Sequence, residues 1–142
     1  MSEIIRDITE VARCAVQYRT DRLASVGLKS IHASYLVQIC ANPGISQDGL
    51  AKRIFINKSN VARQAAALEE QGFILRKPST ADKRVMELYP TEKAQEVLPL
   101  VREVFQSWEA HIAQDFTAEE LELMSVLLKR MKIRSAAYME DR

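Results

Sequence analysis

The sequence predicts a mainly α-helical fold with one small β-hairpin. Segments at both ends of the 142-residue chain carry apolar side chains every three or four positions, as helices buried along one face do. After Gly72 the pattern changes to alternating apolar and polar residues, which indicates strands. A chain of this length, with 47% hydrophobic and 27% charged residues, is typical of one compact domain. The expected order is four helices, a hairpin and two long helices.

The first two helices are each predicted from apolar positions and a stop signal. The first runs from Glu3 to about Leu23, and Gly27 ends it. The second begins at about Ser30, whose hydroxyl suits an N-cap, and it ends in the turn over 42–44. The apolar stripe of the first helix consists of Ile4, Ile8, Val11, Ala15 and Tyr18.

Two more helices are predicted close together in the sequence, each with a polar cap. Ser46 caps a short helix that turns inward with Leu50, Ala51 and Ile54. Asn57 caps a longer helix over 57–71, and Gly72 marks its end. The inward positions of this longer helix are Val61, Ala65 and Leu68.

The β-hairpin follows at once, with strands over 73–77 and 85–89 joined by a turn over 78–83. Two helices separated by a brief turn and followed by a hairpin are typical of a winged helix-turn-helix. The predicted fold class is therefore mainly α with a small β-hairpin wing.

The last two helices are long. Pro90 and Thr91 open the fifth, which Pro99 is expected to bend rather than end, and Thr117 with Glu120 matches a capping box for the sixth. The apolar stripes of the first, fifth and sixth helices are too long for so small a core. They predict a terminal-helix lobe that packs against a partner chain.

Charge is concentrated in the middle of the sequence. Between Ala51 and Arg84 there are eight Lys or Arg against three Asp or Glu, whereas the whole chain carries only +1. Such asymmetry is expected of a nucleic-acid-binding face on a protein whose remaining surface is acidic. The alternative is a solvated basic face without a partner.

The second helix of a helix-turn-helix enters the DNA major groove with its N-terminal residues. Arg, Asn and Gln side chains there can read bases, and the free N–H groups of the preceding helix attract phosphate. For Ser46, Ser59 and Asn60 the alternative role is helix capping. The predicted contacts of the two helices are Ser46, Gln47, Lys58, Ser59, Asn60, Arg63 and Gln64.

The turn of the hairpin contains Asp82, Lys83 and Arg84. Asp82 is placed to hold the Arg84 guanidinium, and an arginine aimed in this way suits the narrow, electronegative minor groove. Arg76 and Lys77 would then bracket the flanking phosphates. The alternative is a surface ion pair with no function.

Several other classes of protein are disfavoured by the sequence. The N-terminus is charged and has no apolar run, which predicts a cytoplasmic protein rather than a secreted or membrane one. There is no phosphate-binding glycine loop or nucleophile–base pattern, so neither an enzyme nor a cofactor is expected. His111 and Asp115 share a helix face but are too few for a metal site, and none is expected.

The stretch "GISQDGLAKRIFINKSNVARQAAALEEQGFILRKPSTADKRVMELYPTEKA" resembles the MarR (multiple antibiotic resistance regulator) family of bacterial transcription factors. The most specific matches are "LEEQGFILR" and the Asp82, Lys83, Arg84 motif, while Pro90 and Ala94 depart from the usual family Leu and Gly. The resemblance implies one MarR-type domain over 1–142, with a DNA-binding lobe at about 30–90 and dimerisation helices at about 1–25 and 91–142. It also implies a homodimer on pseudo-palindromic promoter DNA, with repression as the expected sign.

The resemblance further implies release from DNA by a small aromatic or anionic effector or by an oxidant. Cys14, one turn before Tyr18 and within possible reach of Tyr35, resembles the organic-peroxide-sensing branch of the family. Cys14 is therefore a candidate redox sensor, and the alternative is a buried packing thiol. A winged helix that binds protein instead of DNA is a further alternative, against which the Asp82 and Arg84 pair argues.

Overall fold

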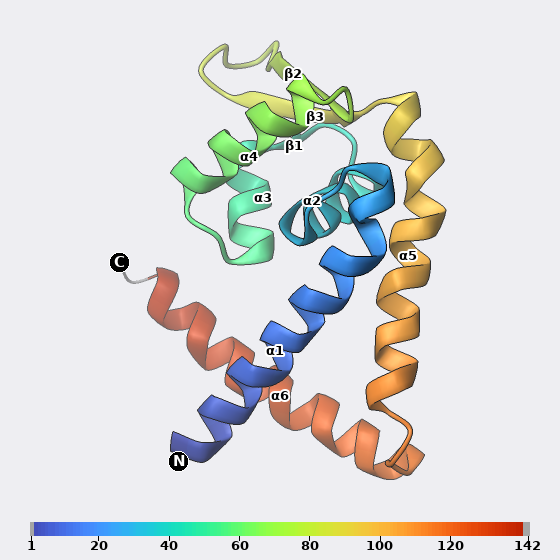
Figure 1. The fold of residues 1–142 in the computed structure, drawn as a ribbon. Helices are drawn as coiled ribbons and strands as arrows, with labels where there is room; N and C mark the ends of the chain where they lie inside the picture. The colour runs from blue at the N-terminus through green and yellow to red at the C-terminus, as the bar shows by residue number, and fades with distance from the viewer. Residues whose placement is uncertain (1, 141–142) are drawn as a thin grey trace. The chain divides into compact units, whose positions relative to one another are not determined.

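The computed structural model describes residues 2–140, which form six α-helices, one short 3-10 helix and three strands (Figure 1). The predicted fold class is confirmed. The elements are α1 (Ser2–Leu23), η1 (Ala24–Val26), α2 (Ser30–Ala41), β1 (Ile45–Ser46), α3 (Gln47–Ile54), α4 (Lys58–Glu70), β2 (Ile74–Pro78), β3 (Met86–Pro90), α5 (Glu92–Ile112) and α6 (Ala118–Glu140).

The chain forms two compact units, one ending at Trp108 and the other beginning at Glu109. The first unit contains the helix-turn-helix and the sheet. The second consists of the end of α5 and all of α6.

The sheet has one strand more than predicted. Its order is β1-β3-β2, and both pairs are antiparallel. The hairpin strands β2 and β3 each begin one residue later than predicted. In β1, only Ile45 and Ser46 pair with Leu88 and Glu87. A two-residue strand has no periodicity of its own, so this pairing had no signal in the sequence.

The helix boundaries follow local chemistry at most ends. Ser46 Oγ accepts the Gly49 N–H at 2.9 Å and Asn57 Oδ1 accepts the Asn60 N–H at 2.8 Å, so both predicted caps are confirmed. Thr117 and Glu120 exchange backbone and side-chain bonds as a capping box. Helix α5 continues through Pro99.

The predicted Ser30 cap is wrong. The N-cap of α2 is Lys29, which makes no side-chain cap hydrogen bond. Ser30 Oγ instead accepts a hydrogen bond from Arg19 Nε at 2.9 Å, which ties α1 to the start of α2. The hydroxyl therefore serves a residue of α1, eleven positions earlier, rather than the backbone of its own helix.

The core of the first unit lies where α2, α3 and α4 meet the sheet. Leu36, Leu50, Val61, Leu68 and Leu88 are fully buried there, one or two from each element. At the end of α4, Gly72 has φ +83 and donates to the Glu69 carbonyl, while Phe73 donates to the Leu68 carbonyl. This double turn needs a left-handed residue, which glycine adopts without strain. It sends the chain from α4 directly into β2.

Candidate nucleic-acid interface

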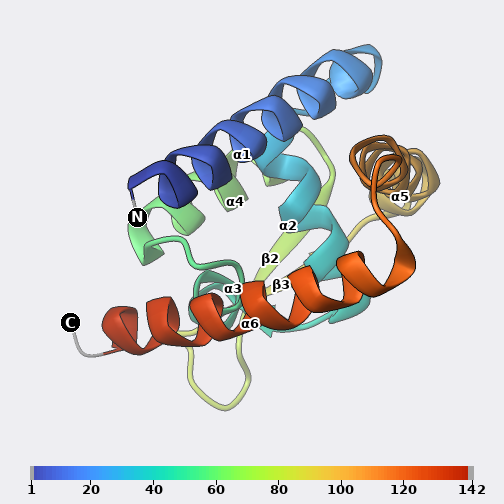
Figure 2. The same ribbon diagram turned by 90° about the horizontal axis from the view of Figure 1, so that it is seen from below.

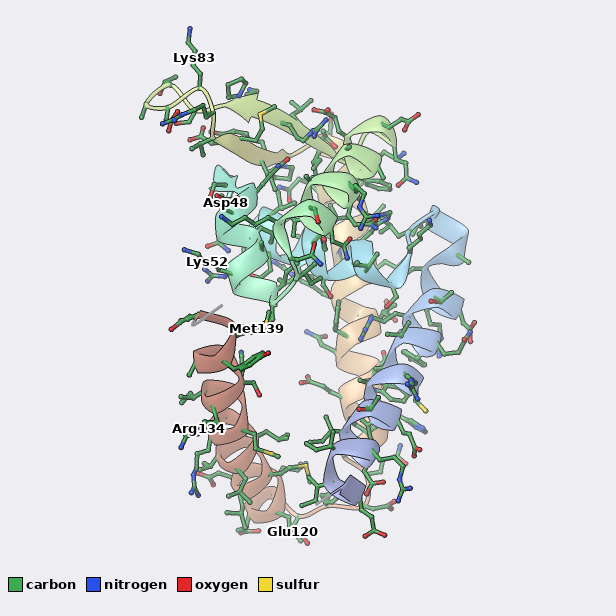
Figure 3. All side chains as sticks on the ribbon, turned by 90° about the vertical axis from the view of Figure 1, so that its left-hand side faces the viewer. Asp48, Lys52, Lys83, Glu120, Arg134 and Met139 are labelled. Carbon is green, nitrogen blue, oxygen red and sulfur yellow. The ribbon has the colours of Figure 1, made fainter. Side chains whose placement is uncertain are left out.

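The start of α4 presents polar side chains held by their neighbours. Ser59 Oγ donates to Asn57 Oδ1 at 2.9 Å, so the hydroxyl joins the capping group rather than standing free. Lys58 Nζ lies 3.4 Å from Asp48 on α3, and both side chains are well exposed. Figure 3 shows Asp48 and Lys52 projecting from α3. One turn further along α4, Arg63 is exposed.

Gln64, which is predicted to contact DNA beside Arg63, is not fully exposed. Its side chain is half-buried, and its Oε1 lies 2.9 Å from Nε2 of the buried His32 on α2. With Nε2–H donating, the bond links the core helix α2 to α4. Contact between Gln64 and DNA stays a prediction, but its carbonyl oxygen already has a partner inside the lobe.

Protonation of His32 is expected to destabilise the first unit in acid. Burial, assisted by the charge of Lys29, lowers the pKa of His32 below its usual 6.5, although the bond to Gln64 acts in the opposite direction. The unfolded chain therefore binds the proton at higher pH than the folded chain. The free energy of unfolding should fall as pH decreases from about 6.5 toward the lower folded-state pKa.

Urea unfolding of the wild type and of His32→Gln at pH 7.5 and pH 5.5 would measure this effect. The wild type should lose more stability than the variant between the two values, because the carboxylates titrate in both proteins and only the imidazole differs. Equal losses would show that His32 does not contribute.

The wing turn holds the predicted ion pair. Arg84 Nε lies 3.1 Å and Nη2 3.2 Å from the two oxygens of Asp82, and the Arg84 N–H also donates to Asp82 at 3.0 Å. These bonds lower the pKa of Asp82, the side-chain bond first and the backbone bond second. The Arg84 side chain is nevertheless 90% exposed. Asp82 therefore orients a guanidinium that remains open to solvent.

Lys83 occupies the outer end of the same turn. Its side chain points away from the rest of the wing in Figure 3, and the turn extends beyond α3 and α4 in Figures 1 and 2. Lys83 and Arg84 together place two cations at the tip.

The base of the wing is arranged differently from the prediction. Arg76 Nε bonds to Glu69 Oε1 of α4 at 3.1 Å, and its side chain is only 25% exposed. Lys77 Nζ lies 5.2 Å from the centre of the Tyr89 ring. Both cations thus have partners within the lobe, and their contact with phosphate stays a prediction.

Two of the predicted DNA contacts, Gln47 and Asn60, have a buried side-chain oxygen. Gln47 Oε1 and Asn60 Oδ1 have no hydrogen-bond partner in the described part of the chain. Gln47 is the first residue of α3 and Asn60 lies in the first turn of α4. The alternative role in capping does not apply to the Asn60 side chain, because the cap uses its backbone N–H.

Cys14 lies exposed on α1. The alternative of a buried packing thiol is therefore wrong for the single chain. Tyr35 is fully buried, so its hydroxyl lies in a different environment from the exposed thiol. Tyr18 packs on Trp108, with the ring centres 5.2 Å apart.

Sequence reasoning missed two residues of this region, His32 and Glu69. His32 bonds to Gln64, which lies 32 residues along the chain, so no local pattern pairs them. Glu69 and Arg76 are only seven residues apart and both lie in the "LEEQGFILR" motif, but the motif did not show that their side chains meet. Within residues 2–140 no group of three or more His, Cys, Asp or Glu side chains could hold a metal ion. No helix in that range is long and apolar enough to cross a membrane.

The capped helix pair, the wing and its exposed arginine define the winged helix-turn-helix class of transcriptional regulators. A family model described as MarR family matches residues 31–86. YybA of Bacillus subtilis (strain 168), an uncharacterized HTH-type transcriptional regulator, is 36% identical over 132 residues, which cover 93% of this chain and 88% of YybA. The chain belongs to the MarR family.

Solved structures agree with this assignment. The transcriptional regulator SlyA has a TM-score of 0.93 and 30% identity, with 96% of each chain covered. A putative MarR family regulator from Listeria monocytogenes, complexed with 26mer DNA, has a TM-score of 0.91 and 31% identity, covering 96% of this chain and 91% of that one. The molecule is a MarR-type transcriptional regulator.

Proposed function

We propose that this regulator is a homodimeric repressor that binds pseudo-palindromic promoter DNA through α4 and the wing. The observation that carries the proposal is the Asp82–Arg84 pair, which holds a 90% exposed guanidinium at the wing tip. The exposed Arg63 on α4 supplies a second cation suited to base contact. The Listeria monocytogenes relative complexed with 26mer DNA supports DNA as the partner.

The division of labour follows the order of the elements. Residues of about 30–90 would form the DNA-binding lobe, and about 1–25 with 91–142 the dimerisation helices. Exposed apolar side chains on α1 and α6 support the second assignment, and no described residue of α6 is buried within the chain. These exposed side chains include Ile4, Ile5, Ile8 and Val11 on α1, and Leu121, Met124, Leu127, Leu128 and Ile133 on α6.

A homodimer should sediment at about 32 kDa at micromolar concentration, twice the 16.1 kDa of the chain. The reason is the exposed apolar surface, which water disfavours and a second copy would cover. Leu127→Glu together with Met131→Glu should shift the protein toward monomer, whereas Glu122→Gln, a surface change on the same helix, should not. A wild-type protein that remains monomeric would remove the basis for a two-fold operator.

The signal that releases DNA is proposed to be a small aromatic or anionic effector or an oxidant. The exposed Cys14 thiol is accessible to a peroxide in the single chain. If it is the sensor, Cys14→Ser should bind DNA normally and no longer release it when organic peroxide is added. A wild-type protein that never releases under oxidation would leave the effector as a non-oxidising ligand.

Selection of bound sequences from a random DNA pool tests the function as a whole. A repressor of this class should enrich one sequence with two related half-sites about one helical turn apart. Transcription from that site in a reconstituted system should fall when the protein is added. Failure to enrich any sequence would favour the protein-binding winged helix over a DNA-binding regulator.

A further inference from the structure

The link between α4 and the wing is a carboxylate clamp formed by Glu69 and Arg76. Glu69 Oε2 accepts the backbone N–H of Arg76 at 2.8 Å, and its Oε1 accepts the Arg76 Nε–H at 3.1 Å. Glu69 belongs to the last turn of α4, whereas Arg76 lies in β2. One side chain of the helix that is proposed to enter the major groove therefore binds both the backbone and the side chain of a wing strand.

The clamp uses a group that the sheet leaves free. Strand β2 is at the edge of the sheet, since the order is β1-β3-β2. Arg76 lies opposite Leu88 of β3, yet its N–H donates to Glu69, so this N–H points away from β3. An edge N–H without a partner would be hydrated or would pair with another chain. Glu69 satisfies it and fixes the edge strand to α4.

The Glu69 and Arg76 side chains are partly shielded from solvent, so the hydrogen bonds between them can fix their relative position. Arg76 is 25% exposed and Glu69 35%, in contrast to the 90% exposure of Arg84. The Arg76 backbone N–H, and then its guanidinium, hold the pKa of the Glu69 carboxyl below its usual value, although partial burial opposes them. Glu69 is therefore a charged acceptor at neutral pH, and bonds to a charged acceptor are the stronger kind.

The other strand of the wing is fixed at the same end. Thr91, which follows β3, donates through its hydroxyl to the Gly72 carbonyl at 2.6 Å, and its N–H donates to the Phe73 carbonyl at 3.0 Å. Lys93 Nζ donates to the Gln71 carbonyl at 2.7 Å. These bonds hold the end of β3 and the start of α5 against the turn that ends α4. The Glu69 clamp adds a direct bond between α4 and β2, which is also paired with β3.

A small rotation at the base has a large effect at the tip. Lys83 is seven residues beyond Arg76, at most about 23 Å of extended chain. A rotation of about 10° about Arg76 would move the tip by up to about 4 Å, more than the length of a hydrogen bond. The groove contact of Arg84 therefore depends on the base as well as on Asp82.

We propose that Glu69 is a positioning residue for DNA recognition, which sets the angle of the wing relative to α4 so that Arg63 and Arg84 engage one DNA site together. The proposal rests on the proposed DNA-binding function. It assigns Arg76 to the clamp in place of the predicted phosphate contact. Glu69 itself needs no contact with DNA, and its own charge would repel phosphate.

The test compares Glu69→Ala with Glu70→Ala. Both remove one negative charge from the same turn, and Glu70 is an exposed neighbour. Removal of charge alone should strengthen DNA binding in both variants. Glu69→Ala also loses the clamp, so it should instead bind the selected site at least about fivefold more weakly than the wild type, equivalent to about 1 kcal/mol. Equal or tighter binding by both variants would overturn the proposal.

A double-mutant cycle separates positioning from general damage. If Glu69 acts through the wing, Glu69→Ala should change affinity by less than about twofold in an Arg84→Ala background, because the misplaced contact is already absent. If the fold-losses of affinity of the two single variants multiply in the double variant, Glu69 does not act through the Arg84 contact. Glu69→Gln, which keeps an acceptor for the Arg76 N–H, should retain most of the affinity and serves as the variant to use if Glu69→Ala unfolds.

Hydrogen exchange measures the clamp without DNA. The Arg76 amide should exchange at least about tenfold faster in Glu69→Ala than in the wild type and Glu70→Ala, since it would lose its bond to the Glu69 carboxylate. This readout remains informative if the chain binds no DNA, so failure of the clamp and failure of the proposed function can be told apart. An Arg76 amide that exchanges at the same rate in all three proteins would overturn the proposal.

Discussion

Arg84→Ala is expected to make the slope of log affinity against log salt shallower by roughly 2 in a dimer, because each wing would lose one cation that neutralises phosphate. The side chain is 90% exposed and fixed by two bonds to Asp82, so little reorganisation is needed for DNA contact. Selected and random DNA should both bind less tightly. Fluorescence anisotropy at several salt concentrations measures the slope and both affinities.

Asp82→Ala is the informative companion of this variant. It raises the charge of the wing, so simple attraction predicts tighter binding. Weaker binding would show that the orientation given to Arg84 outweighs the added positive charge. Lys83→Ala, which removes an adjacent cation that Asp82 does not hold, serves as the control for charge alone. Unchanged affinity and slope in Arg84→Ala would mean that the wing does not touch DNA.

Arg63→Ala should instead reduce specificity. An arginine that reads a base contributes about 1 to 3 kcal/mol of discrimination per contact, so the affinity for the selected site should fall while random DNA is affected much less. Arg63 suits this role because it is exposed one turn into α4, beyond the capping group. Competition of selected against random DNA at constant salt measures the ratio.

Lys58→Ala is the matched control on the same helix. Lys58 is exposed and pairs with Asp48 at 3.4 Å, and a lysine at this position is suited to phosphate. Loss of Lys58 should weaken the binding of selected and random DNA about equally. If Arg63→Ala also leaves the ratio unchanged, Arg63 does not read a base, and specificity must come from other residues of α4 or from DNA shape.

The difference between predicted and observed contacts has one physical origin. Ser46 and Asn57 were recognised as caps because a cap bonds to a backbone N–H only three residues away. Gln64 and Arg76 were predicted to face DNA from their residue types, but both bond to side chains that the fold brings to them, His32 and Glu69. Polar residue type predicts the ability to bond and does not select the partner.

The sequence by itself determined the helices, the hairpin wing, the caps at Ser46, Asn57 and Thr117, and the Asp82–Arg84 pair, because each depends on periodicity or on residues within a few positions of one another. Only the tertiary structure decided that β1 joins the sheet, that Ser30 anchors Arg19, and that Glu69 fixes the wing base. The first two contacts join segments that meet only when the core packs. The third joins two residues of the "LEEQGFILR" motif, whose side chains meet only because the chain turns from α4 into β2. The exposure of Cys14 was likewise decided by packing, since the same apolar stripe is compatible with a buried or an open thiol.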